Sequence, residues 1–396
     1  MYSLGIDLGG TNIVASVVDD QFNIISTAKT KTNAPRPANA IFDDVEKVCR
    51  EAVREAKLTM SDLVAVGMGS PGTCNADGVE KAEKMCILAA EALHLKPEDI
   101  IVASTGVIGQ VLPIEPIEKG IAALAPIISR EGNLDAVQAI MTTDTKPKEE
   151  AYEIEIGGKT VKIGAMAKGS GMIHPNMATM LGFLTTDAAI TTPMLQKALK
   201  LAVDDTFNMV SVDGDTSTND TCLLLANGMA ENTKITEKNA DYETFTKALR
   251  FVNETLAKQM AGDGEGATAL FEVKVIGAET KEQAKILSKS VITSSLTKAA
   301  IYGHDANWGR ILCAMGYSGA QFDPEKVDLF FESAAGKMQI IKDGVAVDYS
   351  EEEATKILSE PAVTAIADIK MGAAQATAWG CDLTYDYVKI NADYRS

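Results

Sequence analysis

Two spacings of apolar residues alternate along this chain of 396 residues and restrict the folds that it can adopt. A spacing of three to four positions predicts amphipathic helices at 38–56, 78–93, 193–205, 242–260 and 281–292. Short apolar runs predict strands at 4–12, 13–18, 63–67, 100–103, 269–275, 327–331 and 338–341, and a hairpin at 152–163. No long linker, repeat or low-complexity segment interrupts this alternation. The expected fold class is therefore α/β, with mixed sheets flanked by helices.

The composition is that of a folded protein and excludes several classes of partner. Hydrophobic residues make up 46% of the chain, and its length predicts two or three domains or lobes. The net charge of −18 argues against a nucleic acid or an anionic membrane as partner. No apolar run approaches the roughly 20 residues that cross a bilayer, and the N-terminus lacks a signal-peptide pattern. We therefore expect a cytoplasmic protein.

The cysteines carry no recognisable site. None of the six belongs to a CxxC pair, and they are scattered over the whole chain: Cys49, Cys74, Cys86, Cys222, Cys313 and Cys381. This spacing gives neither a zinc site nor a disulfide framework. We expect reduced cysteines in and near the core.

The stretch KGSGMIHPNMATML, residues 168–181, places a small residue before a threonine. Cleavage between Ala178 and Thr179 would free the α-amino group of Thr179 beside its own hydroxyl. A threonine hydroxyl is a weak nucleophile that needs a base. An α-amino group, with an ordinary pKa of roughly 7.7–8.0, can accept its proton near neutral pH. Ala-Thr is a common dipeptide, however, and a helix that starts after Asn176 is the alternative interpretation.

Three further segments add specificity: STGVIG at 104–109, DGDTSTND at 213–220 and KAAIYGHDANWGR at 298–310. Together with residues 168–181, they closely resemble the ornithine acetyltransferases, the bifunctional glutamate N-acetyltransferases of arginine biosynthesis (ArgJ family). The likeness covers about residues 74–396 in the family's order and spacing. It implies the family's layered α/β fold and self-cleavage into an α-chain, which ends at residue 178, and a β-chain of residues 179–396.

The resemblance assigns the catalytic roles to three residues. Thr179 is similar to the family's nucleophile. Thr105 and Gly106 resemble its oxyanion stabilisers, a hydroxyl and a backbone N–H that together bind developing negative charge. His174 and His304 could serve as additional bases, but the Thr179 amine makes them unnecessary. We expect structural hydrogen bonds from both histidines.

The resemblance also assigns substrate-binding positions. Thr142 and Lys168 resemble two of them, and a lysine ammonium suits the carboxylate of an amino acid. Glu265 resembles the position that engages the amine end of the substrate; without the resemblance, it would be interpreted as a solvated turn carboxylate. Asn391 and the terminal Ser396 match the family's C-terminal contacts, although the family usually ends in threonine. Thr179 itself completes the set.

The activity implied is ping-pong acetyl transfer in arginine biosynthesis by an acyltransferase. Thr179 takes the acetyl group of N-acetylornithine, ornithine leaves, and glutamate accepts the acetyl group without a metal or organic cofactor. Some members also use acetyl-CoA as donor, and the sequence leaves this open. The family pairs its chains into a heterotetramer of two α- and two β-chains. An N-terminal-nucleophile amidohydrolase, which would release acetate to water, and an inactive fusion are the alternatives.

The DGDTSTND stretch has a second interpretation. Its aspartates would suit a metal cluster, but the resemblance implies a packed turn leading into a helix, so we expect a structural role for Asp213, Asp215 and Asp220. No metal site is predicted in the chain.

Residues 1–73 resemble a different family. GIDLGGTNIVA, residues 5–15, looks like the first phosphate-binding hairpin of bacterial ROK-type glucokinases. In those enzymes, the glycines let the backbone approach the phosphates of ATP, and Asp7 would lie near magnesium. Residues 66–73 also resemble that group, but its catalytic aspartate, its zinc-binding cluster and its second phosphate loop do not follow. We expect a kinase-like segment that replaces the usual family start and has no kinase activity.

Overall fold

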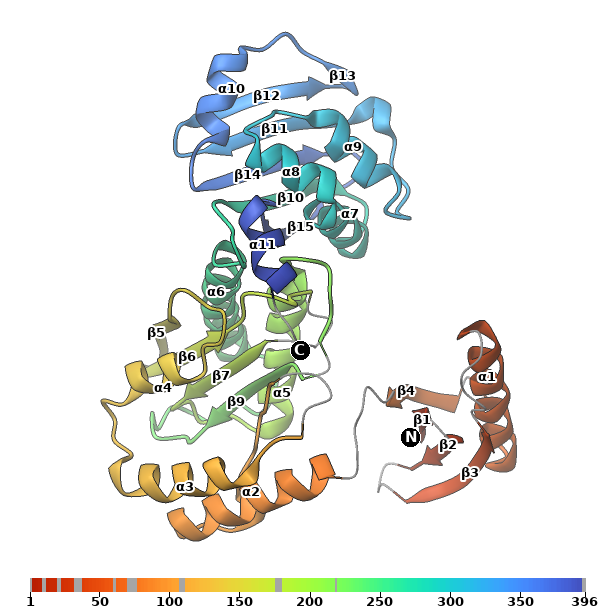
Figure 1. Ribbon diagram of the computed structural model, residues 1–396, viewed down its shortest axis with the longest axis vertical. Coiled ribbons are helices and arrows are strands. Elements are labelled where there is room, and N and C mark those ends of the chain that lie inside the picture. Colours follow the sequence, from red (N-terminus) through yellow and green to blue (C-terminus); the bar gives the residue numbers. More distant parts are fainter. Residues whose placement is uncertain are drawn as a thin grey trace. The chain divides into compact units, whose positions relative to one another are not determined.

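The computed structural model of the chain describes residues 2–8, 12–19, 23–31, 38–59, 62–69, 77–106, 111–174, 180–217 and 219–393 (Figure 1). The chain forms two compact units, and each is described by itself. Met1–Val102 and Gly106–Ala125 belong to the first unit, and Ala103–Thr105 and Pro126–Ser396 to the second. Over the described ranges, no helix is long and apolar enough to cross a membrane.

The first unit contains a four-stranded sheet in the order β3-β2-β1-β4. Its strands are β1 Tyr2–Leu8, β2 Asn12–Val18, β3 Ile24–Lys31 and β4 Leu63–Gly69. Helix α1, Ala38–Glu55, packs against this sheet because Val45, Val48 and Val53 form one apolar face and are buried with Leu4 and Ile13. The predicted helix and strands are confirmed where the structure describes them, whereas residues 9–11 of the predicted glycine turn lie outside the described residues. Strand β3 is an additional strand that we did not predict.

Helices α2, Asp77–Leu93, and α3, Ile114–Leu124, pack against each other in the same unit. The short 3₁₀ turn η2, Pro97–Asp99, follows α2. The strand predicted at 100–103 is wrong, because these residues have no regular secondary structure and Ile101 is 59% exposed. Its apolar residues suit a strand, but a strand exists only where a neighbour completes its backbone hydrogen bonds.

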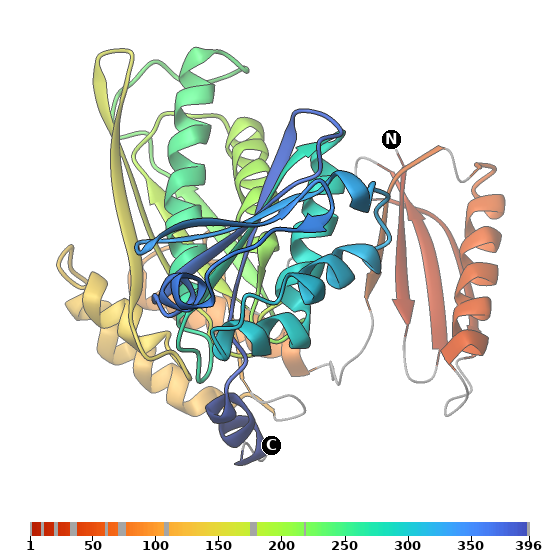
Figure 2. The same cartoon turned by 90° about the horizontal axis from the view of Figure 1, so that it is seen from above.

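The second unit contains two sheets (Figures 1 and 2). The larger has seven strands in the order β13-β12-β11-β14-β10-β15-β8. Its inner strand β10 pairs parallel to β14 and antiparallel to β15, so the sheet is mixed. The bounds are β8 Val210–Ser211, β10 Leu270–Ala278, β11 Asp328–Ser333, β12 Gly336–Lys342, β13 Val345–Ala346, β14 Ala362–Asp368 and β15 Ala374–Cys381.

The smaller sheet has the order β5-β6-β7-β9. Its strands are β5 Lys148–Ile156, β6 Lys159–Lys168, β7 Leu181–Thr186 and β9 Thr221–Ala226. The predicted hairpin is confirmed as β5 and β6. Gly157 and Gly158 turn it with φ of 58° and 74°, a left-handed pair that suits a two-residue hairpin. The helix predicted after residue 220 is wrong, because Thr221 begins strand β9, which pairs parallel to β7.

Helices cover the two sheets and complete one continuous apolar core. Helix α6 lies along β5 and β6 and also packs on β10 and β15, while α7 packs on β10 and β15 (Figure 1). The helices predicted from residues 193, 242 and 281 are confirmed as α5, α6 and α7. The bounds are α4 Asn133–Ala139, η4 Phe207–Met209, α5 Thr192–Asp205, α6 Ala240–Gly262, α7 Lys281–Thr293, α8 Ser295–Tyr302, α9 Trp308–Gly316, α10 Glu351–Leu358 and α11 Tyr385–Asp393.

Candidate functional site

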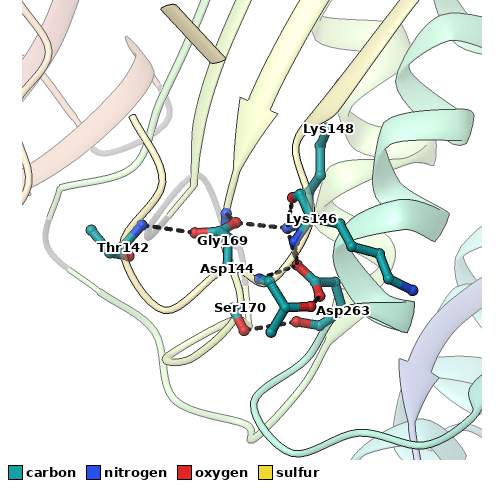
Figure 3. A network of polar contacts seen from close by, with 8 residues as sticks. Thr142, Asp144, Lys146, Lys148, Gly169, Ser170 and Asp263 are labelled. Carbon is teal, nitrogen blue, oxygen red and sulfur yellow. Dashed lines mark hydrogen bonds and ion pairs between the residues drawn. The ribbon is translucent and has the colours of Figure 1, made fainter. Parts of the chain in front are cut away.

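A buried ionic network joins the start of β5 to the end of α6 (Figure 3). The Lys148 ammonium, 1% exposed, donates to Asp144 Oδ1 at 2.7 Å and also to Asp263. Asp263 accepts the Thr145 hydroxyl as well as the Thr145 N–H, the latter at 3.0 Å. Because both carboxylates receive several donors, their burial is compensated. The network fixes the loop of residues 142–146 against the C-terminus of α6.

Asp144 connects this network to the stretch that begins at Lys168. It accepts the Gly169 N–H at 2.7 Å and the Thr142 N–H at 3.1 Å (Figure 3). Burial acts to raise the pKa of Asp144, but the hydrogen bonds from Lys148 and Gly169 outweigh it and lower that pKa below its ordinary value. Thr142, a predicted substrate-binding residue, is thereby held next to the turn at residue 169.

Lys168 ends strand β6, and only 5% of the residue is exposed. Burial lowers the pKa of its ammonium, although the negative charges of Asp144, Asp220 and Glu265 act in the opposite direction. Within the described part of the chain, no hydrogen bond or ion pair joins this ammonium to a carboxylate. An anionic ligand would therefore meet an ammonium group that is not already ion-paired with a carboxylate among the described residues.

Glu265 follows α6 and lies against the turn after Lys168. Its N–H donates to the Ser170 carbonyl at 3.1 Å, and its carboxylate accepts the Asn391 amide at 2.9 Å. A Cβ at Gly171 would lie 2.3 Å from the Glu265 carboxyl carbon, so the close approach requires glycine. The structure thus brings Glu265 and Asn391 into contact, and Glu265 is near enough for its charge to influence Lys168.

Asp220, for which we expected a structural role, is a functional candidate in the structure. Both carboxyl oxygens are buried and have no hydrogen-bond partner among the residues that the structure describes. Burial raises the pKa of Asp220 to about 8, and the nearby Met180 N–H and the Lys168 charge only partly oppose this. Asp220 also borders a cavity of about 300 Å³ with the apolar side chains of Leu199, Phe207 and Met180. Perturbed carboxyls of this kind are concentrated at functional sites.

The structure describes some of the remaining predicted site residues and leaves others out. Ala178, Thr179 and Ser396 lie outside the described residues. Thr105 and Gly106 lie in the irregular stretch after residue 100, where the Ser104 carbonyl accepts the Asn219 amide at 3.1 Å. This contact links Ser104, the first residue of STGVIG, to the DGDTSTND motif within the second unit.

Both histidines make the hydrogen bonds that we expected. His174 Nδ1 lies 3.0 Å from the Ser211 hydroxyl, and His304 Nδ1 lies 3.2 Å from the Ser359 hydroxyl. Burial and the nearby Lys289 ammonium lower the pKa of His174 to about 4. Each of the described cysteines is a free thiol, and Cys74 lies outside the described residues.

Comparison with known proteins places this chain in a family. The ArgJ family model matches residues 12–396. The arginine biosynthesis bifunctional protein ArgJ of Symbiobacterium thermophilum is 54% identical over 84% of this chain and 82% of that protein. The protein of the same name from Caldanaerobacter subterraneus subsp. tengcongensis is 46% identical over 97% of this chain and 93% of that protein.

A solved structure agrees with these relatives. The crystal structure of the arginine biosynthesis bifunctional protein ArgJ from Bacillus halodurans matches with a TM-score of 0.50 and 46% identity, over 53% of this chain and 97% of that chain. The family model begins at residue 12, well before residue 74, where we expected the likeness to begin. These comparisons do not show the glucokinase resemblance of residues 1–73. The match from residue 12 to the end and the identity to these relatives show that the chain belongs to the ArgJ family.

Proposed function

We propose that this chain, an acyltransferase by its family, transfers the acetyl group of N-acetylornithine to glutamate through an acetyl-Thr179 intermediate. The observation that carries the proposal is the convergence of Lys168, Glu265 and Asn391, which are distant in sequence. Asn391 hydrogen-bonds Glu265, and the charge of Glu265 acts on the Lys168 ammonium. A cation and an amide-supported carboxylate suit the two charged ends of an amino-acid substrate.

The nucleophile arises by self-cleavage between Ala178 and Thr179. The Thr179 hydroxyl attacks the Ala178 carbonyl; a C–O bond forms, the C–N bond breaks, and the hydroxyl proton passes to the nitrogen. Water then hydrolyses the ester and leaves an Ala178 carboxylate and a Thr179 with free amine and hydroxyl. Support comes from the solved Bacillus halodurans chain, which is about half as long as this one. A cut near the middle of a family chain would leave a chain of that length.

Acetyl transfer then uses the new N-terminus. The Thr179 amine accepts the hydroxyl proton, and the oxygen attacks the acetyl carbonyl, while the Thr105 hydroxyl and the Gly106 N–H stabilise the oxyanion. The C–N bond to ornithine breaks, and the ornithine amine leaves with the proton. The amine of glutamate attacks the acetyl ester in turn, and the proton returns to Thr179.

Substrate binding is divided between opposite charges. Lys168 holds the α-carboxylate, and Glu265, oriented by Asn391, holds the amine end of the substrate. Thr142 and Ser396 complete the contacts. The chemistry needs no metal or organic cofactor. We further propose assembly of two α- and two β-chains and a cytoplasmic location.

Fragment mass tests the proposal most directly. The intact mass of purified protein should give two fragments that divide before Thr179, and a single 42.0 kDa chain would contradict self-cleavage. Thr179→Ala should abolish both cleavage and the formation of acetylglutamate. Thr185→Ala, at an exposed position of the neighbouring strand β7, is the matched control and should retain both.

Three further assays separate the alternatives. Release of acetate without acetylglutamate would favour an N-terminal-nucleophile amidohydrolase. Acetylglutamate formed from acetyl-CoA would add a second donor. ATP-dependent phosphorylation of glucose would favour the kinase-like interpretation of residues 1–73.

A further inference from the structure

Asp213 accepts two consecutive backbone N–H groups shortly before Thr179. Its Oδ2 accepts from Met172 at 2.7 Å, and its Oδ1 accepts from Ile173 at 3.0 Å. Met172 has a φ of 52°, in the left-handed region that residues other than glycine seldom adopt. Hydrogen bonds to a carboxylate are among the stronger ones in proteins. Asp213 therefore stabilises this turn in a conformation that a methionine seldom adopts.

Neighbours of Asp213 hold the next two residues. The Val212 N–H donates to the Ile173 carbonyl at 2.7 Å, and the Thr216 hydroxyl donates to the His174 carbonyl at 2.9 Å. The Ser211 hydroxyl lies 3.0 Å from His174 Nδ1. His174 is thus fixed at its ring and at its carbonyl, five residues before the proposed nucleophile.

The same stretch of chain holds the other side of the cleavage site. Thr221, which begins β9, donates its N–H to the Met180 carbonyl at 2.8 Å. We refer to Ser211, Val212, Asp213, Thr216 and Thr221 as the clamp. The clamp hydrogen-bonds the chain at residues 172–174 and again at Met180, which lie on opposite sides of the Ala178–Thr179 bond in sequence.

We infer that the clamp positions the Ala178–Thr179 peptide bond for self-cleavage, with Asp213 as its principal positioning residue. The inference rests on the proposed self-cleavage and adds the residues that speed it by holding the chain on both sides of the bond. A hydroxyl that attacks the preceding carbonyl needs a conformation that a free chain rarely visits. Hydrogen bonds on both sides reduce the number of other conformations open to the segment between them. A misplacement of the reacting groups by about 1 Å can slow a reaction about 100-fold.

Asp213→Asn in the full chain tests the inference. Asparagine keeps the size of the side chain but turns an NH₂ group toward one of the two N–H donors. We expect the rate of fragment appearance, followed by intact mass after cell-free synthesis, to fall about 100-fold. Acetyl transfer per cut chain should stay within about threefold of wild type, whereas general structural damage would lower both rates.

Asp382→Asn is the matched control. Asp382 also accepts two consecutive N–H groups, from Thr268 at 2.9 Å and Ala269 at 3.2 Å, but makes no hydrogen bond with the described residues beside the cut. We expect it to lower the unfolding temperature at least as much as Asp213→Asn does and to leave the cleavage rate near wild type. Equal slowing in both variants would overturn a specific role for Asp213.

Thr216→Val decides the case if Asp213→Asn does not fold. The Thr216 side chain is exposed, so valine removes one hydrogen bond without disturbing the core. We expect cleavage about fivefold slower at an unchanged unfolding temperature.

Wild-type protein that is never cut would contradict the proposed function itself. Wild-type cleavage together with unslowed cleavage in the folded variants would overturn only the clamp.

Discussion

At the scale of single residues, Gly171 shows how the backbone leaves room for a functional side chain. A Cβ there would meet the Glu265 carboxyl group, whose atoms lie 2.3–2.4 Å from the ideal position. Because that group is the far end of a flexible side chain, Gly171→Ala should displace Glu265 rather than unfold the protein. We expect KM for acetylornithine to rise about tenfold, as for loss of one hydrogen bond to a charged group.

Gly164→Ala is the control for this prediction. A Cβ at Gly164 meets only the Thr185 hydroxyl, at an ordinary 3.7 Å. Steady-state kinetics should therefore show an unchanged KM in this variant. A Gly171→Ala enzyme with wild-type KM would argue that Glu265 does not bind the substrate.

Asp220 predicts a dependence of stability on pH. Its pKa is about 8 in the folded chain, against roughly 3.9 for an ordinary aspartate. Between these values the unfolded chain has lost the proton and the folded chain has kept it, so stability falls as pH rises. Asp220→Asn, which stays neutral, should raise the unfolding temperature more at pH 8 than at pH 5. Asp323, a partly exposed residue whose pKa is lowered by its hydrogen bond from Lys326, supplies the control: Asp323→Asn should show no such gain at pH 8.

Sequence alone could identify only some of these residues. Lys168, Glu265 and Asn391 were found because they stand in motifs that resemble a family. Asp213 and Asp220 stand in one motif too, yet the sequence does not distinguish them. The difference arises from tertiary structure: Asp213 meets two backbone donors that precede it by about 40 residues, whereas the carboxyl oxygens of Asp220 are buried with no hydrogen-bond partner among the described residues.

At the scale of elements, the Lys148 network determines how β5, the loop before it and α6 fit together. Lys148→Met would leave Asp144 and Asp263 buried without their shared cation. Removal of one member of a buried pair typically lowers the free energy of unfolding by about 3–5 kcal/mol. Urea unfolding should show a loss of that size. Lys162→Met, which breaks an exposed pair with Glu153, should change the free energy by less than about 1 kcal/mol. Similar losses in both variants would contradict the assigned importance of the network.

The elements that were predicted correctly are those with strong local signals. Helix α1 has a regular apolar face, and the hairpin of β5 and β6 has adjacent glycines at its turn. The errors at 100–103 and after residue 220 concern segments whose structure depends on distant partners. Residues 100–103 have no sheet neighbour, whereas β9 exists because β7 lies beside it. Local periodicity contains no information about such pairing.

At the scale of the whole molecule, the proposed cut does not follow a boundary of the fold. Strand β6 would belong to the α-chain and β7 to the β-chain, yet the two strands are paired from Ile163 with Thr186 to Lys168 with Leu181. Helix α6, also in the β-chain, packs on β5 and β6. The two fragments would therefore share one sheet and one apolar core, and neither could leave without exposing it.

We accordingly expect the fragments to stay together after cleavage. Protein with a tag on the C-terminus of the β-chain should bring down the α-chain in equal amount, and both should elute as one species in size-exclusion chromatography. In a concentrated denaturant, the α-chain should be released, while uncut Thr179→Ala protein should stay a single chain under the same conditions. An α-chain that washes away from the tagged β-chain in native buffer would contradict the shared sheet, because broken backbone pairing between β6 and β7 would leave two exposed strand edges.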